Sequence, residues 1–400
     1  MAPGYFRFNR IGGGIDALDG LRALAVILVL LRHAAFPVAT ATGGPVWPIG
    51  GYDLVTPFLN GWIGVDLFFV LSGFLIGGHL LRQEAATFRW QHYLCQRALR
   101  IVPTYWFVLA LVVAGAIPLF KVEGQIVAMR VAYHLLFLQD YLPPNIVVAF
   151  WSLGVEEKFY LLAPVLLLLG STWIRDSRQR LGLLFAVGLL AILSRSLLAL
   201  HDPTTPAYVD FVRTYRFPFH HCVDTLVIGV IAAMLHRDLK AAAKARAGLG
   251  NVLAWGGLAV IGWMLVSGVL LGVIDWWDKT LQPDLIGAAF GAVVLGCALG
   301  GGPQALLSCF ALRVVARISY PLYLIHMALI PLCWHLAGGG PADGGRTLVV
   351  FLPVFLGVSF LAALAIHFVA EKPFLVLKDR IKAERQAARY GAAALFGSRR

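Results

Sequence analysis

Charged residues are scarce in this chain of 400 residues, where they make up 14% against 59% hydrophobic residues. A soluble globular domain carries about a quarter charged residues, so the composition excludes a water-soluble globule. Acidic residues are the scarcer kind, with 21 Asp and Glu against 33 Lys and Arg and a formal net charge of +12. A basic excess in so apolar a chain is typical of the cytoplasmic loops of membrane proteins, so we expect no nucleic-acid partner.

Cysteines are also few and scattered, and no Cys-x-x-Cys pair occurs among the five, which are Cys95, Cys222, Cys297, Cys309 and Cys333. This spacing predicts neither a disulfide framework nor a zinc site, and we expect no metal cofactor. An inverted internal repeat, which many transporters have, is not found in the sequence.

Long apolar runs dominate the sequence instead. A bilayer core of about 30 Å needs about 20 apolar residues in each helix that crosses it. Ten such runs lie at residues 20–37, 61–82, 98–117, 149–171, 181–200, 217–236, 250–272, 284–301, 318–337 and 347–370. The sequence therefore predicts an all-α polytopic membrane protein with a bundle of about ten transmembrane helices.

The basic residues predict the orientation of this bundle. If the N-terminus is cytoplasmic, 24 of the 33 Lys and Arg fall in inside segments and six in outside segments. The positive-inside rule then makes both termini cytoplasmic. The apolar piece from Val127 to Leu138 predicts a re-entrant or interfacial helix, with an eleventh span as the alternative. We expect a transmembrane domain over residues 1–374 and a basic, cytoplasmic amphipathic tail over 375–400 on the anionic inner leaflet.

Ionisable residues within the apolar runs are candidates for function, because they cost several kcal/mol in a bilayer unless they line a cavity. His33 follows Arg22 by about 16 Å along one helix, which places Arg22 at the cytoplasmic mouth and His33 near the middle of the membrane. Imidazole titrates near neutral pH, so His33 suits chemistry. The structural alternative is an interior histidine that a neighbouring helix satisfies.

Two further groups occur in the second and third runs. Asp66 lies near the outer third of the second run, where a structural ion pair is the alternative to a chemical role. Ser72 precedes a glycine near the middle, where a close ligand approach and simple helix packing are both open. Arg97 and Arg100 share a helix face at the cytoplasmic entry of the third run, and their planar guanidinium groups are suited to binding phosphate oxygens. Plain topological anchoring is the alternative for these arginines.

The fourth run begins at Trp151 with two adjacent carboxylates. Ser152, Glu156 and Tyr160 are spaced four residues apart and share one helix face. We place Glu156 and Glu157 at the outer end of this run, where they either bind an extracytoplasmic substrate or serve as a base. The alternative is a solvated helix start, which acidic residues favour.

Two later runs carry polar sets as well. In the ninth run, Tyr323 and His326 share a face with Ser319. In the sixth run, the histidines at 220–221 lie beside Asp224, and we interpret them as the wall of a polar cavity rather than as metal ligands.

In this order the residues resemble the bacterial integral-membrane acyltransferase-3 family, from Leu18 to Phe374. Five blocks carry the resemblance: Arg22 followed by His33, Asp66-Leu-Phe-Phe-Val-Leu-Ser-Gly-Phe, Arg97-x-x-Arg100 before Pro103, Trp151-Ser-Leu-x-Val-Glu-Glu-x-Phe-Tyr160, and Ile318-Ser-Tyr-Pro-Leu-Tyr-Leu-Ile-His326. The resemblance implies a ten-helix bundle in the bacterial cytoplasmic (inner) membrane. It also implies a cytoplasmic acyl-CoA donor, commonly acetyl-CoA, and a carbohydrate hydroxyl on the outer side as acceptor. The essential histidine and arginine of the family's first span match His33 and Arg22, and its paired arginines match Arg97 and Arg100.

The resemblance and the residues together predict an O-acyltransferase site. The expected catalytic residues are His33, Glu156, Tyr323 and His326. The expected donor-binding residues are Arg22, Ser72, Arg97 and Arg100, and the expected acceptor-binding residues are Asp66, Trp151, Glu157 and Asp224. His33 acts either as a general base or as the acylated group. The rival hypothesis is a proton-coupled transporter or flippase of a glycan or lipid, in which the same buried groups relay protons.

Overall fold

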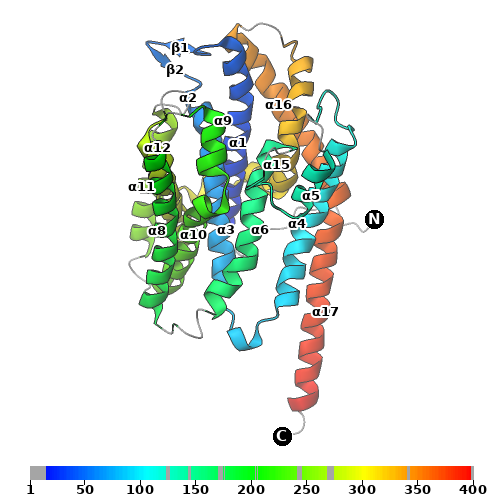
Figure 1. The fold of residues 1–400 in the computed structure, drawn as a ribbon. Coiled ribbons are helices and arrows are strands. Elements are labelled where there is room, and N and C mark those ends of the chain that lie inside the picture. The colour runs from blue at the N-terminus through cyan, green and yellow to red at the C-terminus, as the bar shows by residue number, and fades with distance from the viewer. Residues whose placement is uncertain are drawn as a thin grey trace.

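The computed structural model describes residues 15–122, 127–142, 146–169, 176–202, 206–240, 246–267, 274–339 and 343–397, together with residues 174 and 204. Nearly all of them are helical (Figure 1). In chain order the elements are α1 (Asp16–Thr42), β1 (Pro48–Ile49), β2 (Tyr52–Asp53), α2 (Thr56–Leu59), η1 (Asn60–Ile63), α3 (Gly64–Leu80), η2 (Ala85–Thr87), α4 (Trp90–Val113), α5 (Val127–Leu135), η3 (Val148–Phe150), α6 (Trp151–Pro164), η4 (Val165–Leu169), α8 (Ser177–His201), α9 (Tyr208–Phe211), η5 (Val212–Arg216), α10 (Phe219–Lys240), α11 (Arg246–Val266), α12 (Trp276–Thr280), α13 (Gln282–Ala298), α14 (Gln304–Leu307), α15 (Phe310–Leu336), α16 (Gly344–Ile366), η6 (His367–Glu371) and α17 (Lys372–Gly397).

Eight helical segments in the described ranges are long and apolar enough to cross a membrane. They are Asp16–Thr42, Thr56–Leu80, Trp90–Val113, Ser177–His201, Phe219–Leu239, Ala247–Val266, Phe310–Leu336 and Gly344–Glu384. The two other expected runs correspond to α13, which has 17 residues, and to α6, which continues into the π-helix η4. The expected all-α polytopic membrane class is confirmed.

The apolar piece that begins at Val127 is the short helix α5. It has nine residues, and a helix rises 1.5 Å per residue, so α5 is too short to cross a bilayer. The alternative of an eleventh span is therefore wrong for this segment.

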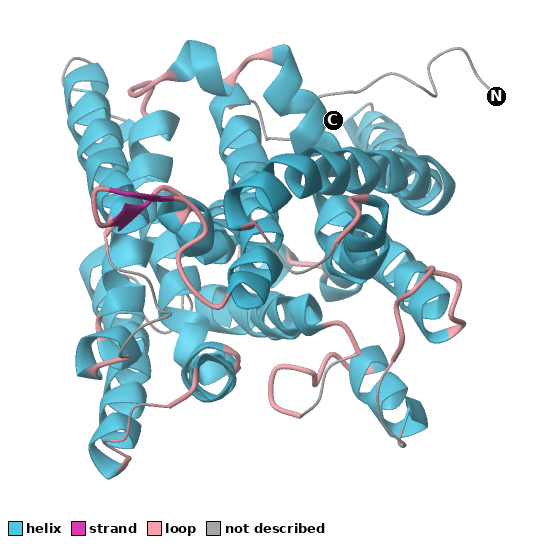
Figure 2. Cartoon of the chain, turned by 90° about the horizontal axis from the view of Figure 1, so that it is seen from above, coloured by secondary structure: helices cyan, strands magenta, loops and turns pink. Residues whose placement is uncertain are grey.

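The helices run side by side around α1, which packs against α3, α15 and α16 (Figure 1). Figure 2 shows from above that helices form every side of the bundle, with one small hairpin of strands among the described residues. In that hairpin, β1 and β2 pair antiparallel after the end of α1. At the opposite end of the bundle, α17 projects beyond the other helices (Figure 1).

The expected C-terminal tail lies in α17 up to Gly397, and residues 398–400 of the tail and 1–14 of the expected transmembrane domain lie outside the described residues. This helix follows α16 and η6 without a break, and it packs against α4. The segment is thus a continuation of the last long helix rather than a separate helix with its own direction.

The helices α3 and α10 meet at two glycines. A Cβ on Gly73 would overlap the carbonyl oxygen of Leu226, and one on Gly229 would overlap that of Val70. Small residues let two membrane helices approach this closely. Gly73 therefore serves helix packing, and this packing fixes the direction in which the neighbouring Ser72 points.

The helix α6 begins inside the bundle. Ala149 and Phe150 of the preceding turn η3 are buried, and so is Trp151, the first residue of α6. Gln139 holds this turn in place, because its Nε2 donates a hydrogen bond to the carbonyl oxygen of Phe150 at 3.0 Å. Side chains one or two turns into α6 consequently lie deep in the protein.

Candidate functional site

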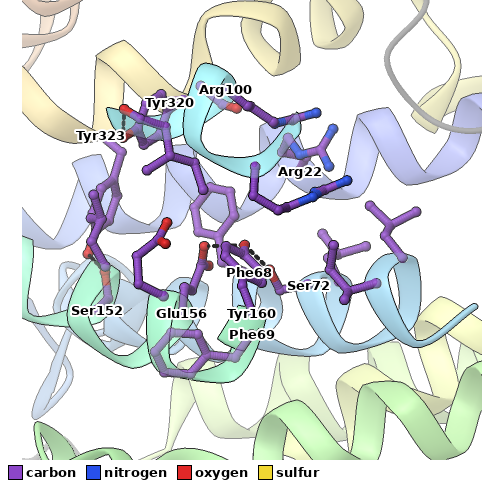
Figure 3. Close-up of a pocket in the computed structure, with 18 of the residues that line it drawn as sticks. Arg22, Phe68, Phe69, Ser72, Arg100, Ser152, Glu156, Tyr160, Tyr320 and Tyr323 are labelled. Atoms are coloured by element: carbon purple, nitrogen blue, oxygen red, sulfur yellow. Dashed lines mark hydrogen bonds between the residues drawn. The ribbon is translucent and has the colours of Figure 1, made fainter. Parts of the chain in front are cut away.

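A cavity of about 310 Å³ lies where five of the helices meet. Its lining residues come from α1, α3, α4, α6 and α15 and include Arg22, Phe68, Ser72, Arg97, Arg100, Ser152, Glu156, Glu157, Tyr160, Ser319, Tyr320 and Tyr323. Figure 3 shows Arg22 and Arg100 on one side of the cavity, and Ser152 with Tyr323 on the opposite side. The cavity therefore has a cationic end and a hydroxyl-rich end.

Three arginines form the cationic end. The structure places Arg22 of α1 in the same cavity as Arg97 and Arg100 of α4, so the three meet at one level of the bundle as the sequence suggested. Arg22 forms a 3.5 Å ion pair with Asp19, one turn earlier in α1. The Nε atom of Arg97 is buried and has no hydrogen-bond partner in the described part of the chain. This end can hold an anion with several negative charges.

The carboxylates of α6 lie in the same cavity as these arginines. Our placement of Glu156 and Glu157 at the outer end of the fourth run, apart from the arginines, is therefore wrong. The physical reason is the buried start of α6, which carries its second turn into the bundle. Tyr160 donates a hydrogen bond to Oε2 of Glu156, and Ser72 shares one with the Tyr160 hydroxyl, both at 2.7 Å. The face that Ser152, Glu156 and Tyr160 share does line the cavity.

Tyr323 closes the hydroxyl-rich end. Its hydroxyl lies 2.7 Å from Oγ of Ser152 and donates to the carbonyl oxygen of Ala149 at 2.9 Å. Its ring packs edge-on against Phe68, with centroids 5.9 Å apart. It also contacts the ring of His326 at a tilt of 48°, with centroids 5.7 Å apart. Tyr323 is thus the wall between the cavity and a pair of histidines.

His33 and His326 form that pair. Nδ1 of His326 donates to the carbonyl oxygen of Tyr323 at 2.7 Å, and Nδ1 of His33 donates to that of Val29 at 2.8 Å. Because carbonyl oxygens only accept, both neutral rings carry their proton on Nδ1. The single proton on Nδ1 of His33 is then shared, because Nε2 of His326 also accepts from it at the longer distance of 3.2 Å. This arrangement leaves Nε2 of His33 with a lone pair, as a general base requires.

Asp66 lies in a buried ion pair instead of the cavity. Both of its carboxylate oxygens accept hydrogen bonds from Nη2 of Arg216 at 2.7 Å. The guanidinium of Arg216 also lies over the ring of Trp62 at 5.0 Å. Asp66 therefore forms the structural ion pair that was the alternative to a chemical role.

Asp224 is likewise paired. It forms a 2.7 Å ion pair with the fully buried Arg195, which also binds Asp284 at 2.5 Å and donates to the carbonyl oxygen of Thr280 at 3.1 Å. Trp151 is buried and stacks on Phe217, with ring centroids 4.8 Å apart. Neither Asp224 nor Trp151 belongs to the residues that line the cavity.

Comparisons with known proteins show the family to which the chain belongs. A family model described as an acyltransferase domain, that of acyltransferase-3, matches residues 15–368. The chain belongs to the acyltransferase-3 family. Among the relatives that the chain resembles is the peptidoglycan O-acetyltransferase OatA of Listeria monocytogenes, which is 28% identical over 218 residues, covering 50% of this chain and 32% of that protein.

Two further relatives are similar over other shares of the chain. The O-acetyltransferase OatA of Staphylococcus aureus is 26% identical over 338 residues, covering 79% of the chain and 50% of that protein. The putative membrane-bound transacylase BcsY of Komagataeibacter xylinus is 30% identical over 165 residues, or 38% of the chain and 37% of that protein. The chain therefore spans about a third to a half of these relatives. No solved structure matches it.

Sequence reasoning missed several residues of the cavity and of the buried ion pairs. Arg195 and Arg216 neutralise the buried aspartates, and His79 and Arg82 also line the cavity. The signal that could have found Arg195 is its place inside an apolar run, where an arginine needs an acidic partner. The pairing itself joins residues far apart in the sequence, so spacing alone does not reveal it.

Proposed function

We propose that the protein is an O-acyltransferase that moves an acyl group, most simply acetyl, from cytoplasmic acyl-CoA to a carbohydrate hydroxyl on the outer side of the bacterial cytoplasmic membrane. One observation carries the proposal. A single helix, α1, places Arg22 in the cavity beside two further arginines and places His33, with a free Nε2 lone pair, beside His326. The relatives whose names specify an O-acetyltransferase support the acyl group and the glycan acceptor.

Arg22, Arg97 and Arg100 bind the diphosphate of the donor. Guanidinium groups form charge-assisted, bidentate hydrogen bonds with phosphate oxygens, and these bonds are about twice as strong as neutral ones. The pantetheine arm then lies along the polar wall that Ser72 and Tyr160 form. Its thioester end reaches the histidine pair past Tyr323, which touches the cavity on one side and His326 on the other.

His33 is the general base of the transfer. The acceptor hydroxyl oxygen attacks the thioester carbonyl carbon, and its proton passes to Nε2 of His33. When the carbon–sulfur bond breaks, CoA leaves as a thiolate and takes up that proton, so free CoA thiol and an ester are the products. His326 holds the ring of His33 in the required orientation and does not itself touch the reacting atoms.

The placement of Glu156 in the donor cavity changes its proposed role. With Tyr160 and Ser72 it forms a hydrogen-bonded row in the same cavity as the arginines. We assign this row to positioning of the donor arm and of the arginines, and no longer to recognition of the acceptor. Glu157, whose Oε1 is buried without a hydrogen-bond partner in the described part of the chain, belongs to the same wall.

The test is transfer of label by the purified protein in lipid nanodiscs. Radiolabelled acetyl-CoA is supplied with peptidoglycan fragments as acceptor, and we expect ester-linked label in the glycan. His33→Ala should abolish the transfer while leaving CoA binding intact, because His33 does not line the cavity. Movement of glycan into sealed vesicles without any acyl transfer would instead identify a transporter.

A further inference from the structure

Two lysines of α17 extend the cationic end of the cavity toward the membrane surface. Lys378 is half-buried and lies within electrostatic reach of Arg97 and Arg100. Lys382 lies within reach of His79, which lines the cavity. The long final helix thus brings basic groups beside α4, one of the helices that build the cavity.

Contacts between α17 and α4 fix this arrangement. Nε2 of Gln96 on α4 donates to the carbonyl oxygen of Lys378 at 3.5 Å. Lys378 and Lys382 are four residues apart and share one helix face. Arg380 lies between them in sequence and is exposed, and at 100° per residue it points to the other side of the helix.

The cluster joins five basic side chains, and the neighbouring carboxylates of Asp19, Glu156, Glu157 and Asp379 offset only part of their charge. Like charges a few ångströms apart repel, more strongly where water is partly excluded. Asp379 offsets part of the charge of Lys378. The buried Nε of Arg97 still has no hydrogen-bond partner among the described residues. A bound ligand with several phosphate charges would relieve this repulsion and satisfy that donor.

We infer that Lys378 and Lys382 bind the ribose 3′-phosphate of acyl-CoA, an inference that rests on the proposed function. In CoA the order from the thiol is pantetheine, diphosphate and then the phosphorylated ribose. With the diphosphate on the arginines inside the cavity, the ribose phosphate lies further out, at the face of α17 that carries the lysines. The last helix therefore selects a nucleotide-linked donor over an acyl group on pantetheine alone.

The experiment compares CoA with 3′-dephospho-CoA in binding to the protein in nanodiscs of neutral lipid, with a Lys378→Ala/Lys382→Ala variant beside wild type. We expect the variant to bind CoA about tenfold more weakly, equivalent to about 1.4 kcal/mol. Its affinity for 3′-dephospho-CoA should equal that of wild type. The matched control, Arg380→Ala, removes the same charge from the other face of the same helix and should leave both affinities unchanged.

Each other outcome overturns the inference in a distinct way. Equal losses for both ligands would assign the lysines to the diphosphate. Unchanged CoA binding, together with weaker binding to phosphatidylglycerol vesicles, would assign them to lipid headgroups. Wild-type protein that binds no CoA would refute the proposed function itself. If the double variant cannot be purified, Lys382→Ala, at an exposed position, tests the same difference at about threefold.

Discussion

The histidine pair yields the sharpest prediction, because its hydrogen bonds assign different roles to two similar side chains. His326 contributes one hydrogen bond to His33, at 3.2 Å, while Val29 holds the same Nδ1 at 2.8 Å. Removing a neutral hydrogen bond costs about 0.5–1.5 kcal/mol, so His326→Ala should lower kcat about two- to twelvefold. His33→Ala removes the base and should lower kcat about 10²- to 10⁴-fold.

The assay is initial-rate transfer from radiolabelled acetyl-CoA at saturating acceptor. KM for the donor should stay unchanged in both variants, because neither histidine lines the cavity. His326→Gln offers a new acceptor to His33 and should recover most of the rate. His335→Ala, at an exposed position on the same helix, serves as the control. If His326→Ala proves as damaging as His33→Ala and glutamine gives no recovery, the assignment of His33 as the sole base is wrong.

The remaining predictions concern the donor, the buried charges and the orientation. Arg97→Ala and Arg100→Ala each remove a charge-assisted contact worth about 1.5–3 kcal/mol, so KM for acyl-CoA should rise about ten- to hundredfold. An unchanged KM would mean that both arginines only anchor the helix at the cytoplasmic side of the membrane. Asp66→Asn leaves Arg216 buried without its counter-charge and should reduce the free energy of unfolding by about 3–5 kcal/mol, which thermal melts in detergent would measure, and a melting temperature equal to wild type would contradict it. Trp47→Cys, at an exposed position of the hairpin, should react with a membrane-impermeant thiol reagent on intact cells, whereas labelling only after lysis would reverse the proposed orientation.

Hydropathy predicted the helices well because a bilayer imposes one rule on every span, namely length and apolarity. Each of the ten expected runs contains a helix among the described residues, including α13 and α6, which are shorter than a typical span. The meeting of Arg22 with Arg97 and Arg100 was also predictable, since basic residues at helix ends mark one membrane level. Such reasoning works when the position of a residue along its helix determines how deep the side chain lies in the membrane.

The depth of α6 could not be predicted in this way. Counting from the end of an apolar run assumes that the helix starts at the surface, but α6 starts beneath the turn at Phe150. Glu156 consequently lies with the arginines and not opposite them. The partners of Asp66 and Asp224 were hidden for a related reason, because Arg216 and Arg195 come from other helices whose neighbours only the packing decides.

The contact between Gly73 and Gly229 links the shape of the cavity to a place that no ligand touches. A methyl group on either glycine would force α3 and α10 apart, and Ser72, one residue from the contact, would move with α3. Changes that adapt the cavity to a bulkier acyl arm are therefore limited by the contact between α3 and α10 as well as by the side chains that line the cavity. An evolving or engineered variant with a wider cavity would therefore leave this turn of α3 unchanged and gain space from α4 and α15.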